Sequence, residues 1–402
     1  MKISEEAKKI IINEFEEFKK RQYDGKTVLE RKELNQFFTP PELSFQLIEE
    51  FENLKGTFFD PTCGSSNLLM AVAIVKKIDL GEKDEDIAVE IFGYDIDERM
   101  INLSKQRFEN YFGHSFENNF VVCDYTTIKI TKTFDKGIAN PPFNKNGSRL
   151  IELEVMENML KQCNNAIILG TTTNVLDIAG DLKRGKKLEK YKNVLNNNLK
   201  KLIKVKNSEA FFDIDLAKEL GIFIIEKNKG ADFDSFRFTD SNGNDLSFLY
   251  NKIIKRIDGT ELSLKKHWSD DKNNENYLPL KVLVSKGNYN IVSFEKPRLK
   301  SNEPEDKKKE WNVARGLILE KKQQENFKKS VCNEFYFFLV KKLLTSQNIK
   351  NINRFLPFMG DYTKVWTNDD YFNYFKLSEY EKEIILKEMK EYTKKFKEKY
   401  ID

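Results

Sequence analysis

Short apolar runs alternate with helical patterns in the first half of the chain, and the runs end in acidic residues. Residues 57–60, 87–97 and 120–124 are three such runs, and each of them finishes with aspartate. The uncharged segment from Asn67 to Val75 follows the first run after a polar turn and predicts a helix. This alternation predicts an α/β fold with a parallel sheet. Acids at successive strand ends then lie along one edge of the sheet, where ligands bind in such folds.

Two helical patterns precede the first apolar run. The first has a stripe made of Ile10, Ile11, Glu14, Phe15 and Phe18, and the second has one made of Leu43, Leu47, Ile48 and Phe51. We expect the N-terminal helix to serve in packing. The charged residues at the N-terminus exclude a signal peptide, and no apolar run approaches the roughly 20 residues that span a bilayer. These features predict a cytoplasmic protein.

Beyond residue 230 the composition changes. The patterns there are a hairpin around Asn242-Gly243, a buried helix from Phe335, an aromatic stretch from Phe355 to Trp366, and a capping box from Ser378 to Glu381 that opens a Lys/Glu-rich helix. We expect the aromatic stretch to be core. The 402 residues therefore divide into an N-terminal extension (1–34), an α/β domain (35–230) and a C-terminal α+β region (231–402).

The tetrapeptide Asn140-Pro141-Pro142-Phe143 follows an apolar strand and suits the methylation of an exocyclic amine. Such an amine is a poor nucleophile because its lone pair is delocalised into the ring. The Asn140 side-chain oxygen and the Pro141 carbonyl can each accept an N–H bond and draw the nitrogen towards a tetrahedral shape. Two prolines fix φ and remove donors, so these carbonyls are held in place, and Phe143 offers a face on which a flipped base can stack. Taken alone, the tetrapeptide is equally typical of a turn.

Five ordered elements resemble the amino-group DNA methyltransferases that use S-adenosylmethionine, in particular the adenine-N6 group with the gamma order of motifs. They are Phe37-Phe38-Thr39-Pro40-Pro41, the loop from Asp60 to Asn67, the acidic ends at Asp95 and Asp124, the tetrapeptide at Asn140, and a C-terminal target-recognition region. The resemblance covers residues 35–230. It implies a class I Rossmann-like methyltransferase domain followed by the α+β target-recognition region.

The resemblance also implies roles for individual residues. The catalytic residues would be Asn140, Pro141, Pro142, Phe143 and Phe211, with Phe212 as the alternative to Phe211, and the cofactor-binding residues would be Phe38, Thr39, Pro40, Asp60, Pro61, Thr62, Cys63, Gly64, Ser65, Asp95, Ile96, Asp124 and Tyr125. Within this set, Asp95 would accept from the ribose hydroxyls, Ile96 would pack on the cofactor's adenine ring, and Asp124 would accept from its amine. Asp97 is expected to cap the next helix. Many relatives have Gly-Ser-Gly in the cofactor loop, whereas this chain has Gly64-Ser65-Ser66.

Other cofactors and chemistries fit the sequence less well. The loop lacks the glycine spacing of a dinucleotide site and the Gly-Lys-Ser/Thr of a nucleotide-phosphate loop. The cysteines are scattered at positions 63, 123, 163 and 332, and there are only two histidines, so we expect no metal site, no disulfide framework and no histidine triad. No cysteine follows a proline, which argues against methylation at cytosine C5.

A basic run lies between the tetrapeptide and Phe211. Residues 182–206 hold ten Lys or Arg and one acid, Glu189. Lysine and arginine neutralise phosphates and release counterions, so the run predicts contact with duplex DNA. The residues singled out for this role are Lys183, Arg184, Lys186, Lys187 and Lys190. The alternative is a solvated helix face.

The predicted activity is transfer of a methyl group from S-adenosylmethionine to N6 of a flipped adenine in duplex DNA, in a restriction-modification context with a possible cognate restriction endonuclease. Asp24 and Glu30-Arg-Lys32 imitate a nuclease motif, but no domain surrounds them, so we expect a stand-alone methyltransferase. Three alternatives stay open: an RNA or protein-glutamine methyltransferase, a modification subunit that needs a partner to recognise DNA, and methylation of cytosine N4.

Overall fold

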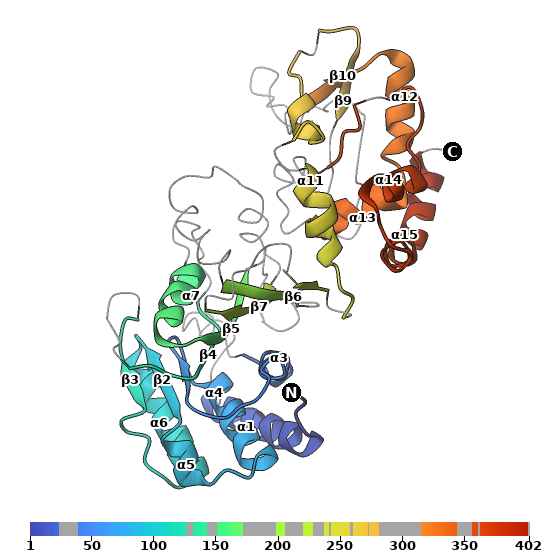
Figure 1. Cartoon of the computed structure of the whole chain (residues 1–402). Coiled ribbons are helices and arrows are strands. Elements are labelled where there is room, and N and C mark those ends of the chain that lie inside the picture. The colour runs from blue at the N-terminus through green and yellow to red at the C-terminus, as the bar shows by residue number, and fades with distance from the viewer. Residues whose placement is uncertain are drawn as a thin grey trace. The chain divides into compact units, whose positions relative to one another are not determined.

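The fold is seen in a computed structural model of the chain. It describes residues 1–23, 39–125, 132–142, 151–171, 198–205, 220–227, 237–240, 243–257, 260–271, 273–280, 315–343, 356–360 and 362–400. This part of the chain divides into two compact units, the first running to Gly243 and the second beginning at Asn244 (Figure 1).

One sheet organises the first unit. In the described residues it has eight strands in the order β3-β2-β1-β4-β5-β7-β6-β8. They are β1 (Phe58–Asp60), β2 (Ile91–Asp95), β3 (Phe120–Val122), β4 (Lys136–Ala139), β5 (Asn165–Thr171), β6 (Leu199–Lys204), β7 (Leu220–Glu226) and β8 (Arg237–Thr239). Strands β1 to β5 are parallel, as predicted, and β7 runs antiparallel between β5 and β6. The strand order reverses between β1 and β4, and in open α/β sheets ligands bind at the carboxyl ends of the strands at such a reversal.

Four helices, together with Ile87 of a shorter helix, share a buried cluster with one face of this sheet. They are α1 (Glu5–Tyr23), α3 (Pro41–Ile48), α4 (Asn67–Asp79) and α6 (Glu98–Phe112). Helix α4 is the predicted uncharged helix, and its residues from Asn67 to Lys76 are all buried. A helix that is apolar on every side is stable only when its neighbours enclose it, which the sheet and the other three helices do here.

The opposite face of the sheet packs against α7 (Ile151–Gln162). Adjacent strand residues point to opposite faces, so Phe59 lies on this side when Phe58 lies on the other. The Met159 side chain of α7 comes so close to Gly137 that a Cβ there would be 2.4 Å from its terminal carbon. The glycine therefore permits the close approach of α7 to β4.

One boundary predicted for the first unit is wrong. The second strand begins at Ile91 rather than at Ile87, because Asp84–Ala88 forms a short helix, α5. Three acids in the first turn of α5 suit the positive end of the helix dipole. Local charge therefore shortens the strand.

The end of the sheet also differs from the sequence pattern. Strand β8 pairs in parallel with β6, so the sheet continues to Thr239, beyond the expected boundary at 230. The hairpin predicted around Asn242-Gly243 includes Ser241 and Asn242, which lie outside the described residues, so it stays a prediction.

The second unit is mainly helical. Its described elements are η1 (Leu249–Ile254), α11 (Lys255–Ile257), η2 (Leu264–His267), the antiparallel strands β9 (Tyr277–Leu280) and β10 (Arg315–Ile318), α12 (Lys321–Ser330), α13 (Glu334–Leu343), α14 (Asn368–Phe375) and α15 (Glu379–Tyr400).

The predicted buried helix is α13. Leu356, Phe358 and Tyr362 are buried, so the described part of the aromatic stretch is core, as expected. Reciprocal hydrogen bonds between Ser378 and Glu381 confirm the capping box. Among the described helices of both units, none is long and apolar enough to cross a bilayer.

Candidate active site

Residues predicted to be functional meet where the strand order reverses. Asp60 ends β1, Asp95 ends β2 and Asn140 follows β4. Because β1 pairs with both β2 and β4, these three residues lie at neighbouring strand ends. The edge predicted from the acidic strand ends therefore exists.

The loop after β1 is held by side chains from other elements. The Gly64 amide donates to Asp95 Oδ2 at 2.8 Å, and the Ser104 hydroxyl donates to the Gly64 carbonyl at 3.1 Å. Arg107 Nη1 donates to the Ser65 carbonyl at 2.8 Å. Two residues of α6 and one strand-end acid thus fix the backbone of the loop.

Ser66 occupies the position where many relatives have glycine. Its backbone is left-handed, with φ 61° and ψ 35°, a conformation that glycine adopts without strain. The Ser66 hydroxyl is buried and donates to Ser104 Oγ at 2.8 Å. The departure from the family pattern is therefore accommodated by a partner on α6.

The acids differ in their proton affinity. The pKa of Asp60 is raised to about 8, mainly by burial; the Thr62 amide lowers it and the nearby Asp95 carboxylate raises it. Burial also raises the pKa of Asp95, while the amides of Asp97 and Gly64 lower it. The guanidinium of Arg99 lowers the pKa of Asp97, whose side chain accepts from the Arg99 amide and caps α6 as expected.

The ends of β2 and β3 present different side chains to the edge. Ile96 is 70% exposed beside Asp95, which is unusual for a large apolar residue. Asp124 is half-buried. Tyr125 is buried and its hydroxyl donates to Gln162 at the end of α7, the position of a wall residue.

Asn140 has two different surroundings at its amide. Its Nδ2 donates to Thr39 Oγ1 at 2.9 Å. Its Oδ1 is buried and has no hydrogen-bond partner among the described residues. A buried acceptor without a partner is costly, so it marks a place where a ligand can donate. Pro40 is the N-cap residue of α3, and Pro141 is buried, whereas Pro142 is exposed.

The remaining loop residues are Pro61, Thr62 and Cys63. The Thr62 amide donates to Asp60 Oδ1 at 2.9 Å. Burial strongly raises the pKa of the Cys63 thiol, which keeps it in the unreactive form. Within the described ranges, no group of three or more His, Cys, Asp or Glu could hold a metal ion, and all four cysteines are free and buried.

Several predicted residues lie outside the described part of the chain. They are Phe38, Phe143, Phe211, Phe212, Lys183, Arg184, Lys186, Lys187 and Lys190. Of the basic run, Lys200, Lys201 and Lys204 are described. Lys200 pairs with Glu52 and Glu226, and Lys201 pairs with Glu50.

The sequence interpretation missed Asn67, Ser104 and Arg107 as residues that shape the site. Ser104 and Arg107 are polar residues on the buried face of α6, beside Ile101 and Phe108. The sequence pattern that could have identified them is a serine and an arginine on an otherwise apolar helix face, because polar groups buried there need hydrogen-bond partners.

The strand order and the reversed β7 define a class I methyltransferase fold, as predicted. Residues 26–166 match the model of the family described as N-6 DNA Methylase, and this match confirms the resemblance inferred from the motifs. No curated protein matches the sequence.

Three solved structures are similar to this chain at low identity. A putative class I S-adenosylmethionine-dependent methyltransferase from Listeria monocytogenes is 16% identical, with a TM-score of 0.39, over 58% of this chain and 73% of that one. The M protein of the type I restriction enzyme EcoKI is 13% identical, with a TM-score of 0.40, over 60% of each chain. A modification subunit of a putative type I restriction enzyme from Vibrio vulnificus YJ016 is 13% identical, with a TM-score of 0.36, over 51% of this chain and 47% of that one. The match thus spans about half to three fifths of the length of the two restriction-enzyme proteins.

Proposed function

We propose that the protein transfers a methyl group from S-adenosylmethionine to the N6 amine of an adenine flipped out of duplex DNA. The observation that carries this proposal is the buried Oδ1 of Asn140, which has no partner among the described residues. Its amide nitrogen is already bound to Thr39, so the oxygen is the half that can accept from a substrate amine. The family match over residues 26–166 supports the same chemistry.

The residues present fit the cofactor. A Cβ on Gly64 would meet no atom within 4 Å, so there is open space beside the loop, and Ile96 offers an exposed apolar side chain for an adenine ring. Each carboxylate oxygen of Asp95 accepts one backbone amide and retains a second lone pair for a ribose hydroxyl. When bound, the cofactor supplies an electrophilic methyl group on a sulfonium.

Asn140 would act on the substrate amine. A hydrogen bond from the amine to Oδ1 strengthens as the nitrogen becomes tetrahedral, so it lowers the barrier more than it tightens ground-state binding. Asn140 would hold the amine nitrogen while it takes the methyl group that the cofactor would supply, and the amine would then release one proton to solvent. Phe143 and Phe211 are proposed to hold the flipped base, and Lys183 to Lys190 to contact the DNA backbone.

The test of the chemistry is Asn140→Ala. We expect cofactor and DNA binding close to wild type and a loss of about a hundredfold or more in turnover, because one preorganised acceptor is removed. Labelled cofactor on duplex DNA, followed by nucleoside analysis, measures the transfer. Label in N4-methylcytosine, RNA or protein, or full turnover by the variant, would contradict the proposal. Transfer to DNA only after a partner protein is added would favour a modification subunit.

The cofactor site is tested separately with Asp95→Ala. This variant loses the acceptor for the Gly64 amide and for the ribose, so we expect binding of S-adenosylmethionine to weaken at least tenfold, which is about 1.4 kcal/mol. Titration calorimetry in the presence of a chelator measures the affinity. Asp97→Ala is the matched control, since it removes a neighbouring carboxylate that caps α6. Equal affinities for the two variants would contradict the assignment.

A further inference from the structure

A buried ion pair joins the N-terminal helix to the domain that carries the site. Glu14 lies in the apolar stripe of α1, and Arg107 donates from Nε to Glu14 Oε1 at 2.8 Å and from Nη2 to Glu14 Oε2. The side chains of Arg107 and Glu14 are only 3% and 10% exposed. Removing two charges from water costs about as much as their attraction returns, so such a pair is weak evidence for a role in stability. Another role is needed to explain it.

The third guanidinium nitrogen leads from this pair to the cofactor loop. Arg107 Nη1 donates to the Ser65 carbonyl at 2.8 Å and also to Asn67 Oδ1. Asn67 is 8% exposed, so its carboxamide has little access to water. With Oδ1 held by Arg107, the Asn67 amide is oriented with Nδ2 towards Thr39.

From Asn67 the hydrogen bonds continue to the proposed catalytic amide. Asn67 Nδ2 donates to the Thr39 carbonyl at 3.2 Å. The Thr39 hydroxyl in turn accepts from Asn140 Nδ2 at 2.9 Å. Because Asn140 Nδ2 donates to Thr39 Oγ1, the amide is oriented with Oδ1 on its other side, and Oδ1 has no hydrogen-bond partner among the described residues. A continuous buried path therefore runs from α1 to the orientation of the Asn140 amide.

We propose that Glu14 and Arg107 are positioning residues of the methyl-transfer site. They hold the Ser65 carbonyl and the Asn67 carboxamide, and through Thr39 they keep the Asn140 oxygen aimed at the substrate amine. Helix α1 is on this account part of the active-site support and not only packing. The inference rests on the proposed function for its last step, whereas its effect on the cofactor loop is independent of which substrate is methylated.

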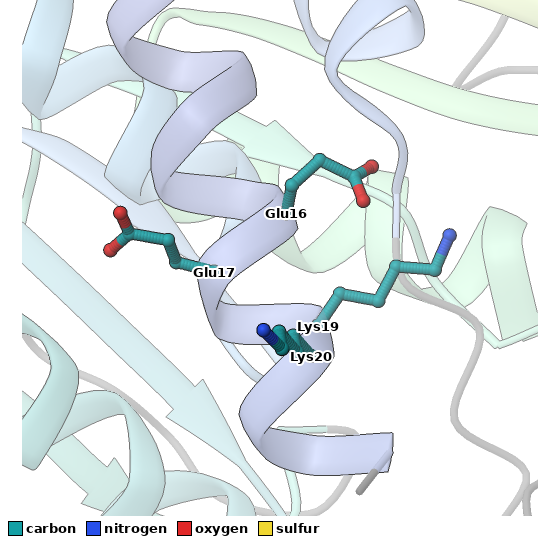
Figure 2. A pocket seen from close by; sticks show the side chains of 4 residues that line it. All are labelled: Glu16, Glu17, Lys19 and Lys20. Carbon is teal, nitrogen blue, oxygen red and sulfur yellow. The ribbon is translucent and has the colours of Figure 1, made fainter.

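The other charged residues of α1 offer a matched control. Figure 2 shows Glu16 and Glu17 projecting from opposite sides of the helix, with Lys19 and Lys20 one turn further on. These four residues line one pocket. Glu16 is exposed, so Glu16→Gln removes a carboxylate from the same helix without touching the buried path.

The central variant replaces both members of the pair, Glu14→Leu with Arg107→Met, in the full chain. Ile11, Phe15 and Met70 surround the site, so the new side chains have apolar neighbours. Replacing a buried ion pair with apolar residues is often neutral or stabilising. The Ser65 carbonyl and Asn67 Oδ1 lose their donor in this variant, so we expect a folded protein with an unfolding midpoint somewhat below wild type, and affinity for S-adenosylmethionine and a single-turnover rate each about tenfold lower. If the ion pair served only the stability of the fold, the folded double variant would keep the wild-type cofactor affinity and single-turnover rate.

Arg107→Lys provides a second folded variant. The ammonium keeps the ion pair with Glu14 but lacks the planar fork that also holds Ser65 and Asn67. We expect it to lower cofactor affinity as the double variant does, while Glu16→Gln matches wild type. The proposal would be overturned if either the double variant or Arg107→Lys were folded and bound S-adenosylmethionine with wild-type affinity.

The step through Thr39 has its own readout. Thr39→Val removes the hydroxyl that accepts from Asn140, so we expect the loss in single-turnover rate from Arg107→Lys to be much smaller in the Thr39→Val background. Fully additive losses would contradict positioning through Thr39. If wild-type protein methylated no DNA, the proposed function would fail, and the cofactor affinities would still decide whether the pair positions the loop.

Discussion

Burial gives single residues at the strand ends their chemical character. Asp60 is 2% exposed and its pKa rises to about 8, whereas Asp97, bonded to Arg99, has a lowered pKa. Asn140 likewise depends on its surroundings, because the same amide is bound at its nitrogen while the described residues offer its oxygen no donor. Residue identity alone does not distinguish these states.

The raised pKa of Asp60 makes stability depend on pH. The carboxyl has an ordinary pKa of 3.8 and a folded pKa of about 8, so the folded protein holds a proton that the unfolded chain loses. The stabilisation from this group is complete below pH 3.8 and is lost as the pH rises through about 8. In Asp60→Asn this loss should disappear, so its stability relative to wild type should grow by about 2–4 kcal/mol between pH 5 and pH 9. Urea unfolding at both pH values measures it, and a constant difference would contradict the assignment.

At the scale of elements, the apolar pattern predicts that a helix or strand is present better than it predicts the residues where that element begins and ends. The helix predicted from Asn67 is α4, but the strand expected from Ile87 begins at Ile91 because acids favour the helix α5 before it. At the start of α4, Ser66 adopts a left-handed backbone conformation, which is unfavourable for a residue that has a Cβ atom. Its hydrogen bond to Ser104 on α6 compensates.

Two substitutions separate the backbone and side-chain contributions at the start of α4. Ser66→Ala loses the hydrogen bond to Ser104 and keeps the left-handed strain, so it should lower the free energy of unfolding by about 1 kcal/mol. Ser66→Gly also loses the bond but relieves strain of about 1 kcal/mol, so it should be close to wild type. Thermal and urea denaturation compare the three proteins. An alanine variant as stable as the glycine variant would show that the strain is negligible.

At the scale of the whole molecule, the first unit holds the strand ends with Asp60, Asp95 and Asn140, and the second has its own aromatic core. We propose that the second unit reads the DNA sequence and that the basic run binds phosphates. Two of the described lysines of the run, Lys200 and Lys201, instead form ion pairs with acids of the first unit.

The basic run can be tested by its salt dependence. Replacing Lys186, Lys187 and Lys190 with Gln should weaken binding to all duplexes alike and reduce the salt slope by about one for each phosphate that the variant no longer neutralises. Lys201→Gln is the control, because its ammonium already pairs with Glu50 at 2.9 Å and should contribute little. Fluorescence anisotropy across a salt series measures both. An unchanged slope in the triple variant would mean that the run is only a solvated face.

The sequence by itself determined the alternation of strands and helices, the acids at the strand ends and the Asn-Pro-Pro-Phe element, because each depends on residues close together in the chain. Only the tertiary structure decided that Glu14 pairs with Arg107, 93 residues away, and that Thr39 orients Asn140, 101 residues away. It also decided that β8 joins the sheet in parallel with β6. Burial and hydrogen bonding between distant segments depend on how the elements pack, and no local pattern of apolar and polar residues contains that information.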